Sequence, residues 1–123
     1  MKVLLSIKPE YVEKILDGSK KFEFRKNLFK KEGVKTVVIY STMPVGKIVA
    51  EFEIEDILCE SPDLVWDATK RSAGISKEFF DTYYVGKEKA VAIQVGKLKK
   101  YDEPFCISLL GDTIRPPQSY RYL

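Results

Sequence analysis

One short segment, DGSKKFEFRK at residues 17–26, gathers side chains that could do chemistry together. Lys20, Glu23 and Arg25 lie within six residues of one another. A lysine and an arginine can hold a phosphate, the arginine through two parallel hydrogen bonds. A carboxylate can accept a hydrogen bond from the exocyclic amine of a nucleobase. The trio therefore suits recognition of a nucleotide, although on an exposed strand it would be only a solvated face with a weak ion pair.

The same residues can also be considered as catalysts. As a general base, Lys20 would need a pKa that falls from about 10.4 to near 7. A nearby Glu23 carboxylate opposes that fall because it favours the ammonium form, so burial or Arg25 would have to supply it. From the residues alone, binding is favoured over turnover. If the protein is an enzyme, Lys20 and Glu23 are the expected acid/base partners.

Metal and cofactor chemistry finds little support in the composition. The chain has no histidine and only two cysteines, Cys59 and Cys106, which are far apart and expected to be reduced thiols. A zinc site of the usual kind cannot be assembled from them. Glu51, Glu53 and Glu55 alternate along one segment, which is typical of a wet strand face rather than a divalent ion site. We predict no metal and no cofactor.

The elements that must position Lys20, Glu23 and Arg25 follow from residue periodicity. Residues 2–8 read as a strand, and Pro9 then begins a helix that Gly18 ends. Phe22 and Phe24 alternate with charged residues, as in a strand. Further strands are predicted at 35–42, 47–60 and 89–101, and further helices at 61–72 and 76–86. The pattern indicates an α+β fold built on a small, strongly curved sheet.

Length and charge set broader limits. A chain of 123 residues, 45% hydrophobic and 32% charged, is expected to form a single domain, residues 1–123. No apolar run approaches the roughly 20 residues of a membrane span, and we predict a cytoplasmic protein. The net charge is only +3, but residues 18–35 carry 7 − 2 = +5 and residues 51–67 carry seven acids and no base. Basic and acidic segments could form opposite faces, or pair and cancel.

The segment 18–25 resembles the hallmark of the ASCH domain, a family within the PUA-like superfamily. The hallmark has the form G-x-K-x-x-E-x-R, and here it reads GSKKFEFR. The resemblance covers residues 2 to about 108, which leaves about 109–123 as a C-terminal extension. It implies a PUA-like small curved β-barrel of about five to six strands, with two to three short flanking helices and a cleft beside the motif.

The resemblance also implies a role in binding RNA or a modified nucleotide. Some members are hydrolases of an acylated nucleoside, some are proposed to cut RNA, and others are linked to transcriptional regulation. The nucleoside-hydrolase branch has a threonine where this chain has Glu23, so that activity is not favoured here.

These observations lead to one leading hypothesis and two alternatives. The leading one is an RNA- or modified-nucleotide-binding module, with single-stranded RNA favoured over duplex because its bases can stack on aromatic side chains. The alternatives are a small metal-independent hydrolase, either an acylated-nucleoside amidohydrolase or a ribonuclease, and a regulator that docks proteins on its acidic face. Tyr40 is the first candidate for base stacking, and Tyr120 and Tyr122 come next. The predicted binding residues are Lys8, Lys20, Glu23, Arg25, Tyr40, Ser41 and Tyr120.

Overall fold

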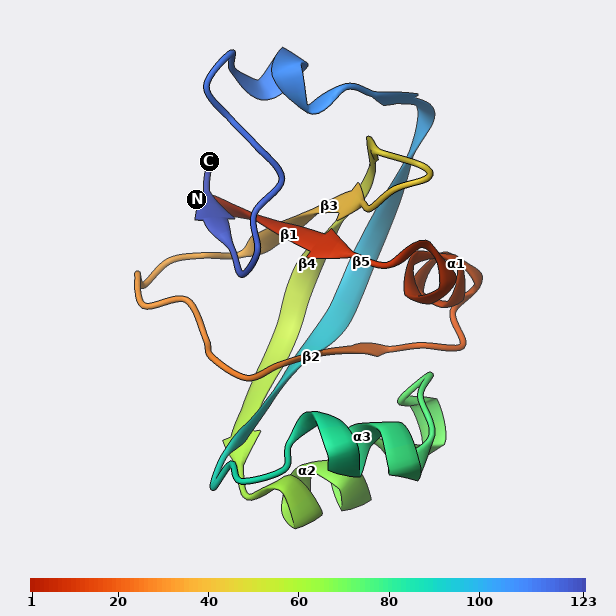
Figure 1. The fold of residues 1–123 in the computed structure, drawn as a ribbon, viewed down its shortest axis with the longest axis vertical. Helices are drawn as coiled ribbons and strands as arrows, with labels where there is room; N and C mark the ends of the chain where they lie inside the picture. The colour runs from red at the N-terminus through yellow and green to blue at the C-terminus, as the bar shows by residue number, and fades with distance from the viewer.

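Six strands form one sheet in the order β2-β5-β4-β3-β1-β6 in the computed structural model, which describes residues 1–123 (Figure 1). β1 and β3 run parallel, and the other neighbouring pairs are antiparallel. The strands are β1 (Lys2–Ile7), β2 (Phe22–Arg25), β3 (Thr36–Ser41), β4 (Lys47–Glu60), β5 (Ala90–Phe105) and β6 (Arg121–Tyr122). The helices are α1 (Pro9–Asp17), α2 (Pro62–Thr69) and α3 (Lys77–Tyr83), with short 3₁₀ turns at Lys70–Ser72 and Ile107–Leu110.

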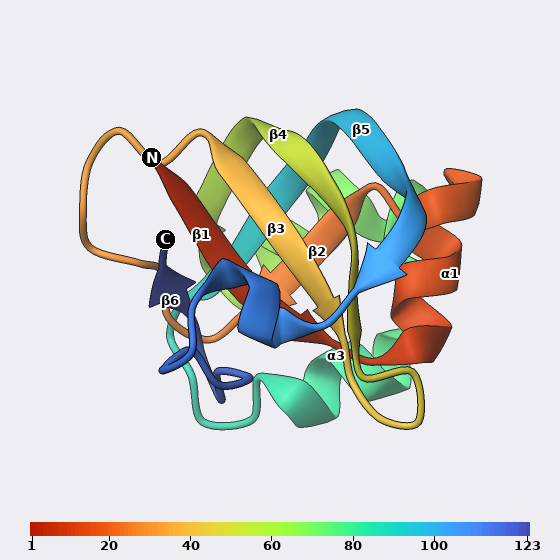
Figure 2. The ribbon, with the colours of Figure 1, turned by 90° about the horizontal axis from the view of Figure 1, so that it is seen from above.

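The sheet is curled into a half-barrel, which confirms the predicted α+β fold (Figure 2). The two longest strands, β4 and β5, produce much of the curl, and their register shifts at irregularities along the pair. One shift falls at Gly96. A Cβ on Gly96 would lie 2.7 Å from the carbonyl oxygen of Glu53, so only glycine allows the two backbones to approach this closely.

The helices predicted over 61–72 and 76–86 begin at the predicted residues, with Ser61 and Ser76 as their N-caps, and end slightly earlier than predicted. The hydroxyl of Ser61 accepts a hydrogen bond from the Leu64 N–H, and that of Ser76 accepts one from the Phe79 N–H. The helix predicted over 61–72 ends at Thr69 and continues as the 3₁₀ turn, and the one predicted over 76–86 ends at Tyr83.

Two main clusters of buried side chains hold the elements together. The larger cluster fills the inside of the curl, between the sheet and α1, and includes Leu5, Ile15, Ile39 and Phe52. The second joins α2 and α3 to the ends of β2 and β5, with Phe80 at its centre. These clusters fix α1 and α3 on either side of β2 (Figure 1).

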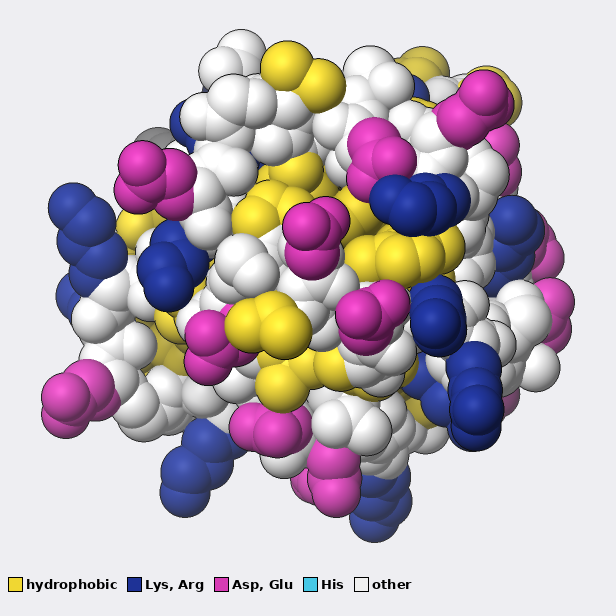
Figure 3. Space-filling view, turned by 90° about the horizontal axis from the view of Figure 1, so that it is seen from below, with side chains coloured by type: hydrophobic (Ala, Val, Ile, Leu, Met, Phe, Trp, Pro, Cys, Tyr) yellow, Lys and Arg dark blue, Asp and Glu magenta, His cyan; other side chains and the backbone are white.

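The acidic and basic segments do not separate cleanly. Glu51 pairs with Lys2 at 3.2 Å and Asp67 pairs with Lys70 at 3.6 Å, so part of the acidic 51–67 run is offset by neighbouring bases. The face seen from below carries acidic and basic side chains interspersed around hydrophobic ones (Figure 3). None of the helices is both long enough and apolar enough to cross a membrane.

Candidate functional site

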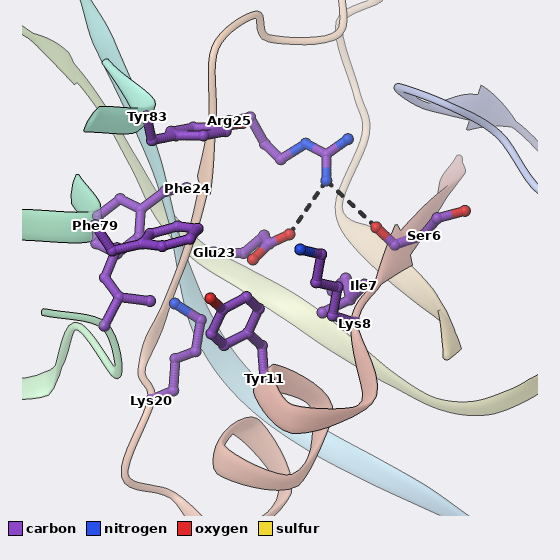
Figure 4. Close-up of a pocket in the computed structure, with 11 residues that line it drawn as sticks. Ser6, Ile7, Lys8, Tyr11, Lys20, Glu23, Phe24, Arg25, Phe79 and Tyr83 are labelled. Atoms are coloured by element: carbon purple, nitrogen blue, oxygen red, sulfur yellow. Dashed lines mark hydrogen bonds and ion pairs between the residues drawn. The ribbon is translucent and has the colours of Figure 1, made fainter. Parts of the chain in front are cut away.

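A cavity of about 270 Å³ opens between the end of β1 and β2, with α1 and α3 as its other walls (Figure 4). β1 and β2 are not neighbours in the sheet; the curl brings them close without pairing them. The cavity therefore lies in the seam where the half-barrel does not close. Its polar lining comes from Ser6, Lys8, Tyr11, Lys20, Glu23 and Arg25.

Lys20 is almost completely buried, with 2% of its surface exposed. It lies in the turn between α1 and β2, before the strand begins, and this turn aims it into the cavity while Lys21 remains exposed. Its Nζ donates a hydrogen bond to the Ala73 carbonyl at 2.7 Å and lies 4.7 Å from the ring centre of Phe24. Burial lowers the pKa of Lys20 to about 8, although Glu23 opposes this shift.

Glu23 and Arg25 project from the same face of β2, as their spacing predicted. Glu23 is 6% exposed, and its carboxylate accepts a hydrogen bond from Arg25 Nη1 at 3.2 Å. Burial raises the pKa of Glu23, while Arg25 and Lys20 act in the opposite direction. Arg25 also donates to the carbonyl oxygens of Ser6 at 3.5 Å and Ser119 at 2.6 Å.

Two ionisable side chains of this cavity have displaced pKa values. The pKa of an acid is raised and that of a base is lowered within one cavity, so both groups are displaced toward the pH range in which they could exchange protons with a substrate. Tyr11 reaches into the same space, and its ring centre lies 5.5 Å from Lys20 Nζ (Figure 4). Arg25 adds a fixed positive charge beside the pair.

The aromatic wall of the cavity was missed in the sequence. Phe79 is 41% exposed, and its ring stacks with that of Tyr83 at a centroid distance of 6.3 Å. The signal was present as two aromatic pairs at i,i+4 spacing in one short helix. Phe80 and Tyr84 are buried and serve the core, which leaves the other pair to face the cavity.

The structure brings together only part of the predicted site. Lys8 lines the cavity with Lys20, Glu23 and Arg25, and its side chain is exposed. The two β3 residues, Tyr40 and Ser41, are 7% and 2% exposed and do not line the cavity, because β3 lies in the middle of the sheet.

The predicted stacking role of Tyr40 is not supported by its position, since its ring packs with Leu4, Val38 and Ile48 and presents no free face. Tyr120 also lies outside the cavity, where its ring packs against those of Phe29 and Tyr122.

A comparison with known protein families agrees with the resemblance seen in the sequence motif. The model of the ASCH domain family matches residues 5–101, which include the whole segment 18–25. The chain belongs to the ASCH domain family. The predicted family and fold are thereby confirmed, and the hallmark Lys20, Glu23 and Arg25 of this ASCH domain all line the cavity.

Several relatives resemble this ASCH domain over nearly its full length. It is 27% identical to an ASCH domain-containing ribonuclease from Zymomonas mobilis, covering 98% of this chain and 82% of that one. It is also 29% identical to the large ribosomal subunit protein uL22 of Ureaplasma parvum and 32% identical to the ATP synthase subunit alpha of the same organism. In these two proteins the chain spans only 39% and 15% of the length.

A solved structure shares the fold. The crystal structure of ASCH from Zymomonas mobilis superposes with a TM-score of 0.90 at 26% identity, over 99% of this chain and 87% of that one. The likeness extends beyond residue 101, so it includes the C-terminal segment that the family model leaves out.

Proposed function

We propose that this ASCH domain protein binds single-stranded RNA in the cavity and cleaves it as a ribonuclease. The observation that carries the proposal is the burial of Lys20 and Glu23 in one cavity, with their pKa values displaced toward each other. A relative named as a ribonuclease, similar over most of both chains, supports the same activity. The first relatives matched are much longer proteins, and their names add nothing about the substrate.

The chemistry needs one base and one acid. The Glu23 carboxylate takes the proton from a ribose 2′-hydroxyl, and the 2′-oxygen forms a bond to the adjacent phosphorus. The bond from phosphorus to the 5′-oxygen breaks, and the Lys20 ammonium gives a proton to that oxygen. The products are a 2′,3′-cyclic phosphate and a free 5′-hydroxyl, so atoms and charges balance without a further reactant.

The remaining cavity residues suit substrate binding. Arg25 and the exposed Lys8 stabilise negative charge on the phosphate. Phe79 and Tyr83 offer an aromatic wall on which an unstacked base can lie, as single-stranded RNA readers use. An unpaired base enters such a cavity more easily than one held in a duplex.

From the sequence, binding was favoured over turnover because Glu23 favours the ammonium form of Lys20 and so opposes its use as a general base. In the proposed reaction Lys20 is the general acid, and the ammonium form is the one that donates the proton. Burial of Lys20 outweighs the effect of Glu23 on the lysine pKa, which falls to about 8. A group with that pKa can donate a proton near neutral pH far more readily than an ordinary lysine.

The test is a cleavage assay on a fluorescent single-stranded RNA, with the matching all-2′-deoxy strand as the control substrate. We expect cleavage of the RNA only, with a 2′,3′-cyclic phosphate on the 5′ product. Glu23→Gln and Lys20→Met should each reduce the rate by about 10²–10⁴-fold. Lys21→Met, an exposed neighbour with no place in the cavity, should leave the rate unchanged. Equal cleavage of the deoxy strand would contradict the role of the 2′-hydroxyl.

A second candidate is the non-catalytic binding of RNA or a modified nucleotide. It is favoured by the contacts of Lys20 Nζ, which the Ala73 carbonyl and the ring of Phe24 hold in place within the protein. In that case the RNA binds with a salt dependence set by its phosphate contacts, and it is recovered intact after long incubation.

A further inference from the structure

Arg25 is the one side chain in the seam that hydrogen-bonds both of the segments facing β2. Its Nη1 donates to Ser6 of β1, and its Nη2 donates to the carbonyl of Ser119 near the C-terminus. Glu23 accepts a further hydrogen bond from Nη1. The terminal nitrogens of the guanidinium are thus held from three directions, whereas Nε has no acceptor within the protein.

The segment that supplies the Ser119 carbonyl, residues 115–123, is here called the C-terminal strap. Its strand β6 pairs with β1, and the Leu123 N–H donates to the Lys2 carbonyl at 3.0 Å. On its other side, the hydroxyl of Tyr122 accepts hydrogen bonds from the backbone N–H groups of Lys30 and Lys31, at 2.8 and 3.0 Å. The strap is therefore tied to β1 and to the loop that follows Arg25.

The strap lies outside the family match, which ends at residue 101, yet it contacts the last residue of the hallmark motif. Covering the edge of β1 requires only the pairing of β6 with β1. The contact between Ser119 and Arg25 is not needed for that purpose. The Ser119–Arg25 hydrogen bond is the shortest that Arg25 makes.

We propose that the C-terminal strap is a working part of the RNA site and that the Ser119 carbonyl positions Arg25 for the substrate phosphate. The inference rests on the proposed function of the cavity. An arginine already held in one rotamer loses less conformational entropy when it binds a phosphate, and its free Nε–H stays directed away from its three protein acceptors. Without the strap, Arg25 is held only by Glu23 and Ser6 and can rotate away.

The test compares two strap variants in two backgrounds. One variant ends after Ile114, and the milder Tyr122→Phe removes only the hydroxyl that anchors the strap to the 30–31 backbone. Thr113→Ala, an exposed change just before the strap, is the matched control. We expect the strap deletion to lower kcat/KM for RNA by about tenfold or more, with a smaller loss for Tyr122→Phe.

The same changes in an Arg25→Ala background decide the mechanism. If the strap acts through Arg25, its loss costs nothing further there. Losses that add in the two backgrounds, or a strap deletion with full activity, would overturn the inference.

A measurement without RNA separates this inference from the proposed function. Arg25 stabilises the charged form of Glu23, so freeing Arg25 should raise the Glu23 pKa further, as followed by NMR titration of its carboxyl carbon. Lys20, the other charge facing Glu23, is unchanged in these variants. If wild-type protein cleaves no RNA but the strap deletion shifts this pKa, the proposed function fails and the positioning role stands. An unshifted pKa in both folded strap variants would refute the positioning role.

Discussion

Gly74 lies directly against the aliphatic chain of Lys20. A Cβ built on Gly74 would approach the Lys20 Cβ to 2.5 Å, far inside contact distance, and the Gly74 φ of 70° is itself unfavourable for other residues. The small residue at 74 therefore gives the buried lysine the space it occupies. This contact joins the loop before α3 to the motif segment.

Gly74→Ala should destabilise the protein because it combines a left-handed backbone with a clash in a packed site. We expect a loss of about 2–5 kcal/mol in the free energy of unfolding, measured by urea denaturation. Gly86→Ala is the matched control: Gly86 has a φ of 76° and open space around it, so only the backbone cost of about 1–2 kcal/mol should appear. Equal losses of stability at both positions would mean that the Lys20 side chain moves aside without an energetic cost.

Burial of Lys20 should make the free energy of unfolding depend on pH in the alkaline range. The folded-state pKa is about 8 and the ordinary value is 10.5, so between these values the unfolded chain binds more protons and stability rises with pH. Relative to Lys20→Met, wild-type protein should gain about 3 kcal/mol from pH 8 to 10.5. Unfolding curves for the two proteins across that range provide the measurement. If the stabilities of wild-type protein and Lys20→Met changed in parallel with pH, the pKa of Lys20 would not be lowered in the folded protein.

Cleavage should follow a bell-shaped pH profile. The rate rises as Glu23 loses its proton, at a pKa above its ordinary 4.5, and falls above about pH 8 as Lys20 loses its own. Initial rates in buffers of constant ionic strength would report both limbs. The residual activity of Glu23→Gln should lack the acid limb, and an unchanged profile in that variant would remove Glu23 from the reaction.

Phe79 and Phe80 are adjacent in sequence, but their substitution should affect different properties: RNA binding for Phe79 and stability for Phe80. Phe79→Ala should change stability little because the ring is 41% exposed, but it should weaken RNA binding by about 1–3 kcal/mol through lost stacking. Phe80→Ala should cost about 3–5 kcal/mol of stability because its ring is 1% exposed. Fluorescence anisotropy and thermal unfolding of both variants provide the comparison. Wild-type affinity in Phe79→Ala would exclude the aromatic wall as a base platform.

Tyr84 should stabilise β2 from below the site. Its hydroxyl contacts the carbonyl oxygens of Arg25 at 2.9 Å and Val91 at 3.1 Å, which lie opposite each other on β2 and β5. Tyr84→Phe should cost about 1–2 kcal/mol in urea unfolding. Tyr83→Phe is the control and should cost less, because the Tyr83 hydroxyl lies near the Lys26 backbone N–H and contacts neither of these strand carbonyls. Equal effects would indicate that the Tyr84 hydroxyl contributes nothing specific.

Much of the fold could be predicted from the sequence because local conformational preferences agree with the tertiary structure. Pro9 and Gly18 bound α1, Ser61 and Ser76 cap their helices, and Gly96 marks a bulge where two strands approach closely. These signals act over a few residues, through backbone conformation and capping hydrogen bonds, so a single sequence carries them. The motif itself is equally local, which is why Glu23 and Arg25 could be placed on one face of β2.

The sequence by itself determined the elements, the family hallmark and the three charged residues of the site. Only the tertiary structure decided how those charges are buried and what surrounds them. The curl of the sheet buries Lys20 and lowers its pKa, buries Tyr40 away from the cavity, and brings Phe79 and the Ser119 carbonyl to a motif about 50 or more residues distant in the chain. Burial depends on what the rest of the chain places around a side chain, and no periodicity within a short segment encodes it.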